Sequence, residues 1–146
     1  MANQTTSDIV IAADAAQVMN VIADFESYPQ WATGVRLCTV LQEGPHGRAE
    51  HVRFVLDAAP IKDEYVLAYV WTADELVTWT LTEGHMLKAM DGAYQLTELG
   101  DGTTRVTYRL AVDVAVPLIG MFKRKAEKVI IDTALKGLKR RVESGG

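Results

Sequence analysis

The sequence has only one cysteine, only three histidines and no long apolar run. The single cysteine and the lack of a long apolar run each exclude a class of protein. A single cysteine, Cys38, can form neither an internal disulfide nor a zinc cluster by itself, which favours a reducing compartment. No apolar stretch approaches the roughly 20 residues that cross a bilayer. The first residues, MANQTTSD, lack the basic and apolar segments of a signal peptide. We therefore expect a cytoplasmic protein without stable membrane insertion.

The composition is that of a globular protein. The 146 residues, 49% hydrophobic and 23% charged, are typical of one domain, which we expect to span residues 1–146. The net charge of −4 is uneven, because residues 118–146 carry eight Lys/Arg against three Asp/Glu. A globally acidic chain is a poor candidate for nonspecific nucleic-acid binding, so no nucleic-acid partner is predicted.

The N-terminal part predicts a strand followed by two short helices. Residues 4–11 end in an apolar run that is typical of a strand. Asp14 precedes Gln17 by three residues, the spacing of a helix N-cap with a capping box. Apolar residues then recur at the spacing of an amphipathic helix: Val18, Val21, Ile22 and Phe25. A second helical piece is expected to carry Phe25, Tyr28 and Trp31.

The next 80 or so residues alternate like strands, with short turns between them. The predicted strands are 35–43, 48–57, 62–72, 75–83, 86–99 and 103–116. Leu37 and Thr39 share the apolar face of the first of these strands, with Cys38 on the opposite face. The apolar faces of the other strands include Val52, Phe54, Leu56, Tyr65, Leu67, Tyr69, Trp71, Val77, Trp79, Leu81, Met90, Gly92, Tyr94, Leu96, Val106, Tyr108, Leu110, Val112 and Val114.

A long helix is predicted over residues 118–142, with Pro117 where a first helical turn tolerates proline. Its apolar stripe is expected to contain Ile119, Phe122, Ala126, Val129, Ile130 and Thr133. Basic residues fill the other faces, as in the runs 123–125 and 139–141, and either contact an anionic membrane or form a solvated face. One apolar stripe must lie on one apolar sheet face, which predicts an α+β protein whose sheet curls around the helix.

Several segments resemble a known family. They are ADFESYPQWATGV (23–35), VTWTLTEG (77–84), the glycine and tyrosine of DGAYQL (91–96), GDGTTRVTYRL (100–110) and ALKGLKRRVE (134–143). Together they resemble the START/Bet v allergen-like (SRPBCC) superfamily, in particular its bacterial polyketide cyclase/dehydrase and lipid-transport branch. The resemblance implies a helix-grip fold, in which a curved antiparallel sheet of seven strands wraps around a long C-terminal helix, with two short N-terminal helices. It also implies a cavity for lipids, sterols, quinones or polyketides.

The favoured function is binding of a hydrophobic small molecule between the sheet and the long helix. Small residues on the helix, such as Ala126, Thr133, Ala134 and Gly137, face large ones on the sheet, and either interdigitate with them or leave a cavity. The expected ligand-binding residues are Phe54, Leu67, Tyr69, Trp71, Trp79, Met90 and Tyr94 on the sheet, and Phe122, Ala126 and Ile130 on the helix. Hydroxyls of Tyr65, Tyr69, Tyr94 and Tyr108 either orient this ligand or bond to backbone or water.

No catalytic constellation, metal site or cofactor motif is predicted. His46 and His85 lie in turns, and His51 lies on a polar strand face. The carboxylates of Glu64, Glu83, Asp91 and Asp113 fall on outward or mixed positions, and Cys38 has no inward histidine to activate it. Two alternatives remain open: a polyketide cyclase or dehydratase that positions a bound chain, and a protein-interaction module. A monomer or an edge-strand homodimer is compatible with either.

Overall fold

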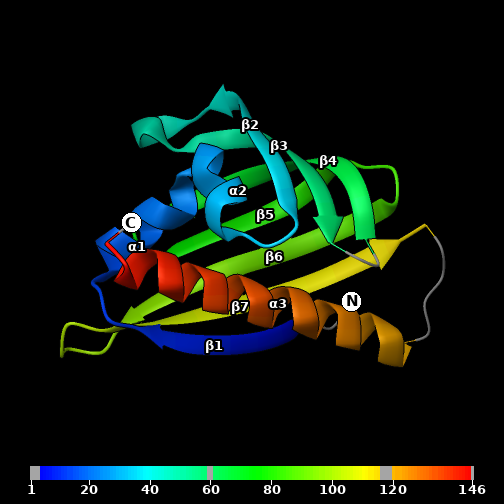
Figure 1. Cartoon of the computed structure of the whole chain (residues 1–146). Coiled ribbons are helices and arrows are strands. Elements are labelled where there is room, and N and C mark those ends of the chain that lie inside the picture. Colours follow the sequence, from blue (N-terminus) through cyan, green and yellow to red (C-terminus); the bar gives the residue numbers. More distant parts are fainter. Residues whose placement is uncertain (1–3, 59–60, 116–119, 146) are drawn as a thin grey trace.

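The computed structural model describes residues 4–58, 61–115 and 120–145; the side chains of residues 58, 61 and 120–122 are outside the description. One antiparallel sheet has the strand order β1-β7-β6-β5-β4-β3-β2. The strands are β1 Thr5–Ile11, β2 Val35–Glu43, β3 Ala49–Ala58, β4 Ile61–Thr72, β5 Leu76–Glu83, β6 Leu87–Glu98 and β7 Thr104–Val114. The sheet curls, and the long helix α3 (Gly120–Glu143) crosses its concave face (Figure 1). The predicted α+β helix-grip fold is confirmed.

The N-terminal helices cover one end of the concave face (Figure 1). Helix α1 (Ala15–Ala23) begins as predicted, because the Asp14 side chain accepts a hydrogen bond of 2.8 Å from the Gln17 N–H. A 3₁₀ turn, η1 (Phe25–Ser27), and the four-residue helix α2 (Tyr28–Trp31) follow, and both contact β2. These short elements bring Phe25 and Tyr28 into the core.

The predicted inward faces of β3 to β7 are confirmed, since side chains such as Val52, Val77 and Val106 are completely buried. The face predicted for β2 is wrong. Cys38 points inward and is 5% exposed, whereas Leu37 is 53% exposed. Strand β2 is an edge strand with apolar residues on both faces and with register shifts against β3, so its apolar pattern does not define one inner face.

The stripe predicted for α3 is also displaced. Val129 is 59% exposed, and Ala126, Ile130 and Thr133 are half-buried. The buried face, which packs against β1 and β7, contains Glu127, Ile131, Leu135, Leu138 and Val142. The predicted stripe contains apolar residues and one threonine, whereas the buried face includes a charged residue, Glu127, which an apolar pattern does not reveal. Pro117 and Ile119 lie outside the described residues, as does the side chain of Phe122.

Candidate ligand-binding interior

Aromatic side chains form a continuous layer over the concave face of the sheet. Strand pairing places Phe54 opposite Tyr65, Tyr69 opposite Trp79, and Tyr94 opposite Tyr108. Ring centroids of Phe54 and Tyr65 lie 5.4 Å apart and those of Tyr94 and Tyr108 lie 4.6 Å apart. Offset and tilted aromatic pairs at such distances stabilise each other beyond the apolar area that they bury. The aromatic layer is therefore a closely packed, largely apolar surface beneath the helices.

Phe25 of η1 packs the N-terminal helices against this aromatic layer. Its ring centroid lies 4.8 Å from that of Tyr69 and 6.1 Å from that of Phe54. Sequence reasoning placed Phe25 on a helix but not in the candidate site. Its helical spacing could not reveal that a 3₁₀ turn would direct the ring onto β3 and β4.

Gly92 makes room for Trp79 rather than for a ligand. A Cβ atom at Gly92 would lie 2.2 Å from Cε2 of the Trp79 ring, so the indole lies directly over the glycine backbone. The two residues are cross-strand partners in β5 and β6. The inward register of Gly92 is compatible either with a bulky neighbour or with room for a ligand, and here the Trp79 ring fills the space of the missing side chain.

The predicted site residues on the sheet do not share one environment. Phe54, Leu67, Tyr69, Trp79 and Tyr94 are all buried at 3–6% exposure, while Met90 is partly buried. Trp71 is half-buried near the edge of the layer. Its indole N–H donates a 2.8 Å hydrogen bond to the Ala49 carbonyl, and the Arg48 guanidinium lies 5.1 Å from its ring centroid. Protein groups thus already occupy the polar atom and one face of Trp71.

On the helix, Ala126 and Ile130 are half-buried, and Ile130 packs against the core. Gly137 serves a close helix contact, because a Cβ atom there would lie 2.7 Å from the Trp31 carbonyl oxygen. At this end of α3 the small residue is used for packing. Ala134 is half-buried as well and packs against the core.

All five tyrosines are buried, but only one hydroxyl has a hydrogen-bond partner among the described residues. The Tyr28 hydroxyl donates to the Ile22 carbonyl oxygen at 2.5 Å. The hydroxyls of Tyr65, Tyr69, Tyr94 and Tyr108 make no hydrogen bond within that part of the chain, although each residue is only 6–7% exposed. In the described part of the chain, Trp31 Nε1 is the one fully buried side-chain polar atom without a partner, so the four hydroxyl oxygens still reach accessible surface. Four such groups in one layer therefore provide donors available to a bound molecule.

Burial fixes the protonation state of these phenols. Desolvation raises the pKa of Tyr69 well above its ordinary value, and the neighbouring ionisable groups of Tyr28 and Tyr65 raise it further. The pKa values of Tyr65, Tyr94 and Tyr108 are also raised, in each case mainly by burial. Each phenol therefore stays protonated at neutral pH, where it can donate a hydrogen bond but cannot act as a base.

Cys38 belongs to the same interior. Its thiol is buried, and burial raises its pKa to about 12, so the thiolate is negligible at neutral pH. Its inward position corrects the predicted orientation.

Two buried carboxylates were missed by sequence reasoning, and both have protein partners. Glu127 is 1% exposed and accepts hydrogen bonds from the Thr5 hydroxyl at 2.6 Å and the Val112 N–H at 2.8 Å. Pairing of β1 with β7 stops at Thr5 and Leu110, so Glu127 supplies the acceptor that Val112 lacks beyond the end of β1. Its regular spacing from Ile131 and Leu135 is the one sequence signal that could have placed it inside.

Asp63 holds the turn between β5 and β6. Its carboxylate accepts hydrogen bonds from the N–H groups of Glu64 at 2.9 Å, His85 at 3.2 Å and Leu87 at 2.8 Å. Burial alone would raise the pKa of Asp63, but the hydrogen bonds from these backbone groups and from Met86 outweigh it and lower the pKa. The carboxylate is consequently a structural anchor for the turn.

Other candidate catalytic groups lie outside the aromatic interior. His46, His85, Glu64, Glu83, Asp91 and Asp113 are exposed, and His51 is half-buried with its ring 3.1 Å from the Gln42 amide oxygen. In the described ranges, no cluster of three or more His, Cys, Asp or Glu side chains is placed to hold a metal ion. No helix within them is long and apolar enough to cross a membrane.

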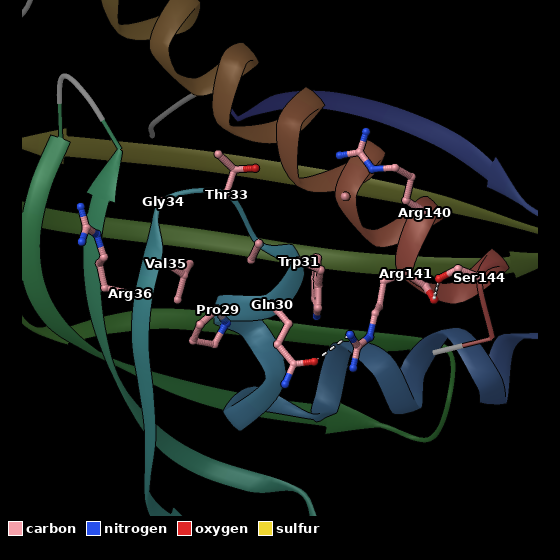
Figure 2. Close-up of a pocket in the computed structure, with 12 residues that line it drawn as sticks. Pro29, Gln30, Trp31, Thr33, Gly34, Val35, Arg36, Arg140, Arg141 and Ser144 are labelled. Atoms are coloured by element: carbon pink, nitrogen blue, oxygen red, sulfur yellow. Dashed lines mark hydrogen bonds between the residues drawn. The ribbon is translucent and has the colours of Figure 1, made fainter.

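A groove lies outside the aromatic layer, between α2, the start of β2 and the last turns of α3. Figure 2 shows this groove, which has a volume of about 720 Å³. Its lining includes Gln30, Trp31, Arg36, Arg140, Arg141 and Ser144. Sequence reasoning described residues 139–141 as a basic run on the helix but did not connect them with Arg36 or with α2.

Comparisons with known proteins agree with this architecture. Residues 3–143 match the model of the family described as polyketide cyclase / dehydrase and lipid transport. A START superfamily protein from Mycobacterium smegmatis is 23% identical, with a TM-score of 0.91 and 99% of each chain covered. The Zhui aromatase/cyclase from Streptomyces sp. R1128 is 16% identical, with a TM-score of 0.76 over 98% of this chain and 94% of that chain. No curated protein matches the sequence.

Proposed function

Because the chain belongs to the polyketide cyclase / dehydrase and lipid transport family, we propose that it binds an uncharged hydrophobic small molecule between the sheet and α3. The ligand is a lipid, quinone or polyketide-like molecule that carries at least one carbonyl group. The observation that carries this proposal is a set of four tyrosines, each only 6–7% exposed, whose hydroxyls reach accessible surface and have no hydrogen-bond partner among the described residues. We place the protein in the cytoplasm, as a monomer or homodimer.

The aromatic layer supplies the affinity for the hydrophobic ligand. Phe54, Tyr69, Trp79 and Tyr94 are almost completely buried, so a ligand among them is enclosed by aromatic rings. The apolar area that the complex buries stabilises it by about 25 cal/mol per Å². Leu67 and Met90 extend this surface, with Ala126 and Ile130 on the helix side. The sequence also predicts Phe122 there, but its side chain is outside the described part of the structure. Trp71 contributes at the edge, since its indole N–H is already bonded to Ala49.

The polar groups supply the selectivity for uncharged acceptors. Protonated phenols donate hydrogen bonds to carbonyl oxygens. Among the described residues no Lys, Arg or His is buried, so a carboxylate or phosphate in the interior would meet no cation. A neutral ketone or quinone therefore fits this interior better than a fatty acid or a phospholipid head group.

These features support binding rather than catalysis. A cyclase or dehydratase needs a group that accepts a proton from the bound chain. The buried phenols and the Cys38 thiol have raised pKa values, and Glu127 and Asp63 are engaged with protein donors. Catalysis by this interior would therefore depend on positioning and hydrogen-bond donation alone.

A matched pair of probes tests the proposal. Flavone is a neutral aromatic ketone, and flavan has nearly the same shape without the carbonyl. Calorimetric titration should show that flavone binds about tenfold more tightly than flavan, since hydrogen bonds from two hydroxyls contribute about 0.5–1.5 kcal/mol each. Equal affinities would contradict the role of the hydroxyls, and no binding of either probe would contradict the proposed interior site.

Native mass spectrometry of protein purified from cells separates the remaining alternatives. A co-purifying neutral lipid or quinone supports the binding function. A large ligand-free oligomer would instead support the protein-interaction module, whose most exposed apolar edge is β2 with Leu37 and Leu41. Turnover of a poly-β-ketone chain into a cyclised product would support the enzyme.

A further inference from the structure

The groove beside α2 is separated from the aromatic interior by Trp31. The Trp31 ring centroid lies 4.8 Å from that of Tyr28, and the Trp31 carbonyl lies close to Gly137 of α3. Trp31 therefore forms a wall with the interior behind it and the groove in front of it (Figure 2). A molecule in the groove would occupy a different site from the ligand proposed above.

The charged side chains that line this groove are all positive. Arg36, Arg140 and Arg141 belong to the lining, and no Asp or Glu does. Arg36 is paired with Asp57 at 3.1 Å, whereas Arg141 donates to the neutral Gln30 side chain at 2.9 Å. The Arg140 guanidinium has no hydrogen bond or ion pair among the described residues. Two guanidinium charges thus remain unneutralised in a chain whose net charge is −4.

The C-terminal position of these arginines explains only part of this arrangement. Cations in the last turn of a helix offset the negative end of its dipole, which accounts for basic residues at 140 and 141. It does not account for a concavity that α2 and β2 complete. It also does not account for the polar groups of Gln30, Thr33 and Ser144 in the same lining.

The size and the chemistry of the groove indicate a small organic ligand. Its volume of about 720 Å³ lies within the range of small-molecule sites, which is about 300–1,000 Å³. Trp31 and Val35 give apolar surface, and the Arg141 side chain points toward Gln30 across the groove (Figure 2). Guanidinium groups bind planar oxyanions with paired hydrogen bonds.

We propose that this groove binds a small amphipathic anion. Its carboxylate or phosphate is held by Arg141 beside Gln30, with Arg140 adding attraction, and its apolar body packs against Trp31 and Val35. The site is independent of the interior site, so the Tyr69→Phe variant is expected to bind the anion as the parent protein does.

Titration of the isotope-labelled protein with three naphthalene probes tests the proposal by NMR. 1-Naphthyl phosphate and 1-naphthylacetate carry the two candidate anions, and 1-naphthol carries neither. We expect at least one anion to shift amide signals of residues 29–36 and 137–144 saturably at millimolar concentration, while 1-naphthol leaves these signals unchanged. The tighter-binding anion identifies the ligand class. No saturable shift with either anion, or shifts confined to the aromatic interior, would overturn the proposal.

Charge variants identify the groups that bind the anion. The double variant Arg140→Gln/Arg141→Gln should weaken anion binding by about tenfold or more, because charge-assisted hydrogen bonds are lost. Arg140→Gln alone removes a guanidinium charge that has no partner among the described residues. The lost attraction should weaken anion binding by about threefold. The matched control Lys125→Gln/Lys136→Gln removes two charges from exposed positions of α3 outside the groove and should change binding by less than about twofold. Equal weakening by the control would show a general charge effect and overturn the site.

Discussion

The two buried carboxylates of this protein accept hydrogen bonds from protein donors, whereas four of its buried tyrosines have hydroxyls without a partner among the described residues. Glu127 and Asp63 lie inside, and their oxygens accept hydrogen bonds from backbone and side-chain donors. Tyr65, Tyr69, Tyr94 and Tyr108 are almost equally buried, but their hydroxyls have no partner among the described residues.

The difference separates structural polar groups from those available to a ligand. Paired groups connect elements that are distant in sequence, as Glu127 connects α3 with β1 and β7. The unpaired hydroxyls connect no elements, and they lie in one aromatic layer on β4, β6 and β7, with Trp79 of β5 between them. Tyr28, with its bond to Ile22, provides an internal reference of the same residue type.

The largest expected effect comes from removing the paired glutamate. Glu127→Ala leaves the buried Val112 N–H without an acceptor and opens a cavity, so we expect the free energy of unfolding to fall by about 3 kcal/mol. Urea denaturation measures the loss. Glu127→Gln keeps an acceptor oxygen and should cost about 1 kcal/mol. If the free energy of unfolding of Glu127→Ala falls by less than about 1 kcal/mol, Glu127 does not have the structural role described here.

Asp63→Asn should have the next largest effect, and one that depends on pH. The substitution replaces a charged acceptor of three backbone N–H groups by a neutral amide. The weaker hydrogen bonds should lower the free energy of unfolding by about 2 kcal/mol at neutral pH. The folded-state pKa of Asp63 lies below the ordinary 3.8. The contribution of the carboxylate is therefore complete above 3.8 and is lost as the pH falls through the lower folded value.

Denaturation at a series of pH values measures this dependence. The stability difference between the parent and Asp63→Asn should stay constant from neutral pH down to about 5 and should shrink in stronger acid. Asp101→Asn provides an exposed acid with a lowered pKa as the control, and its effect should be small. A difference that grows in acid would contradict the assigned role of Asp63.

Tyr28→Phe should have a smaller effect. It removes one hydroxyl that donates to the Ile22 carbonyl, so the free energy of unfolding should fall by about 1 kcal/mol. Thermal unfolding followed by circular dichroism measures the change. An unchanged stability would show that a bonded hydroxyl here contributes no more than an unbonded one, which would remove the reference for the comparison.

Much of this fold is predictable from the sequence, because strong local patterns agree with the tertiary structure. The N-cap at Asp14 and the alternation in β3 to β7 place these elements correctly. Reasoning failed where residue type and environment disagree. Val129 is apolar but exposed, Glu127 is charged but buried, and β2 is apolar on both faces, so that Cys38 could not be oriented.

The candidate site is less predictable than the fold. An inward tyrosine is visible in the alternation of its strand, but whether its hydroxyl meets a partner depends on residues from other elements. The groove shows the same limit, because Arg36 and Arg141 are separated by most of the chain and are brought to one concavity only by α2 and α3. Pairwise contacts of this kind leave no periodic signal.

Two tyrosine variants test the central claim most directly when both unfolding stability and flavone affinity are measured on each. For Tyr69→Phe we predict a stability change within about 0.5 kcal/mol and a loss of flavone affinity of about fivefold. For Tyr28→Phe we predict the reverse, with stability lost and affinity kept within about twofold. If Tyr69→Phe loses as much stability as Tyr28→Phe and binds flavone as the parent does, the Tyr69 hydroxyl belongs to the fold, and the account is contradicted.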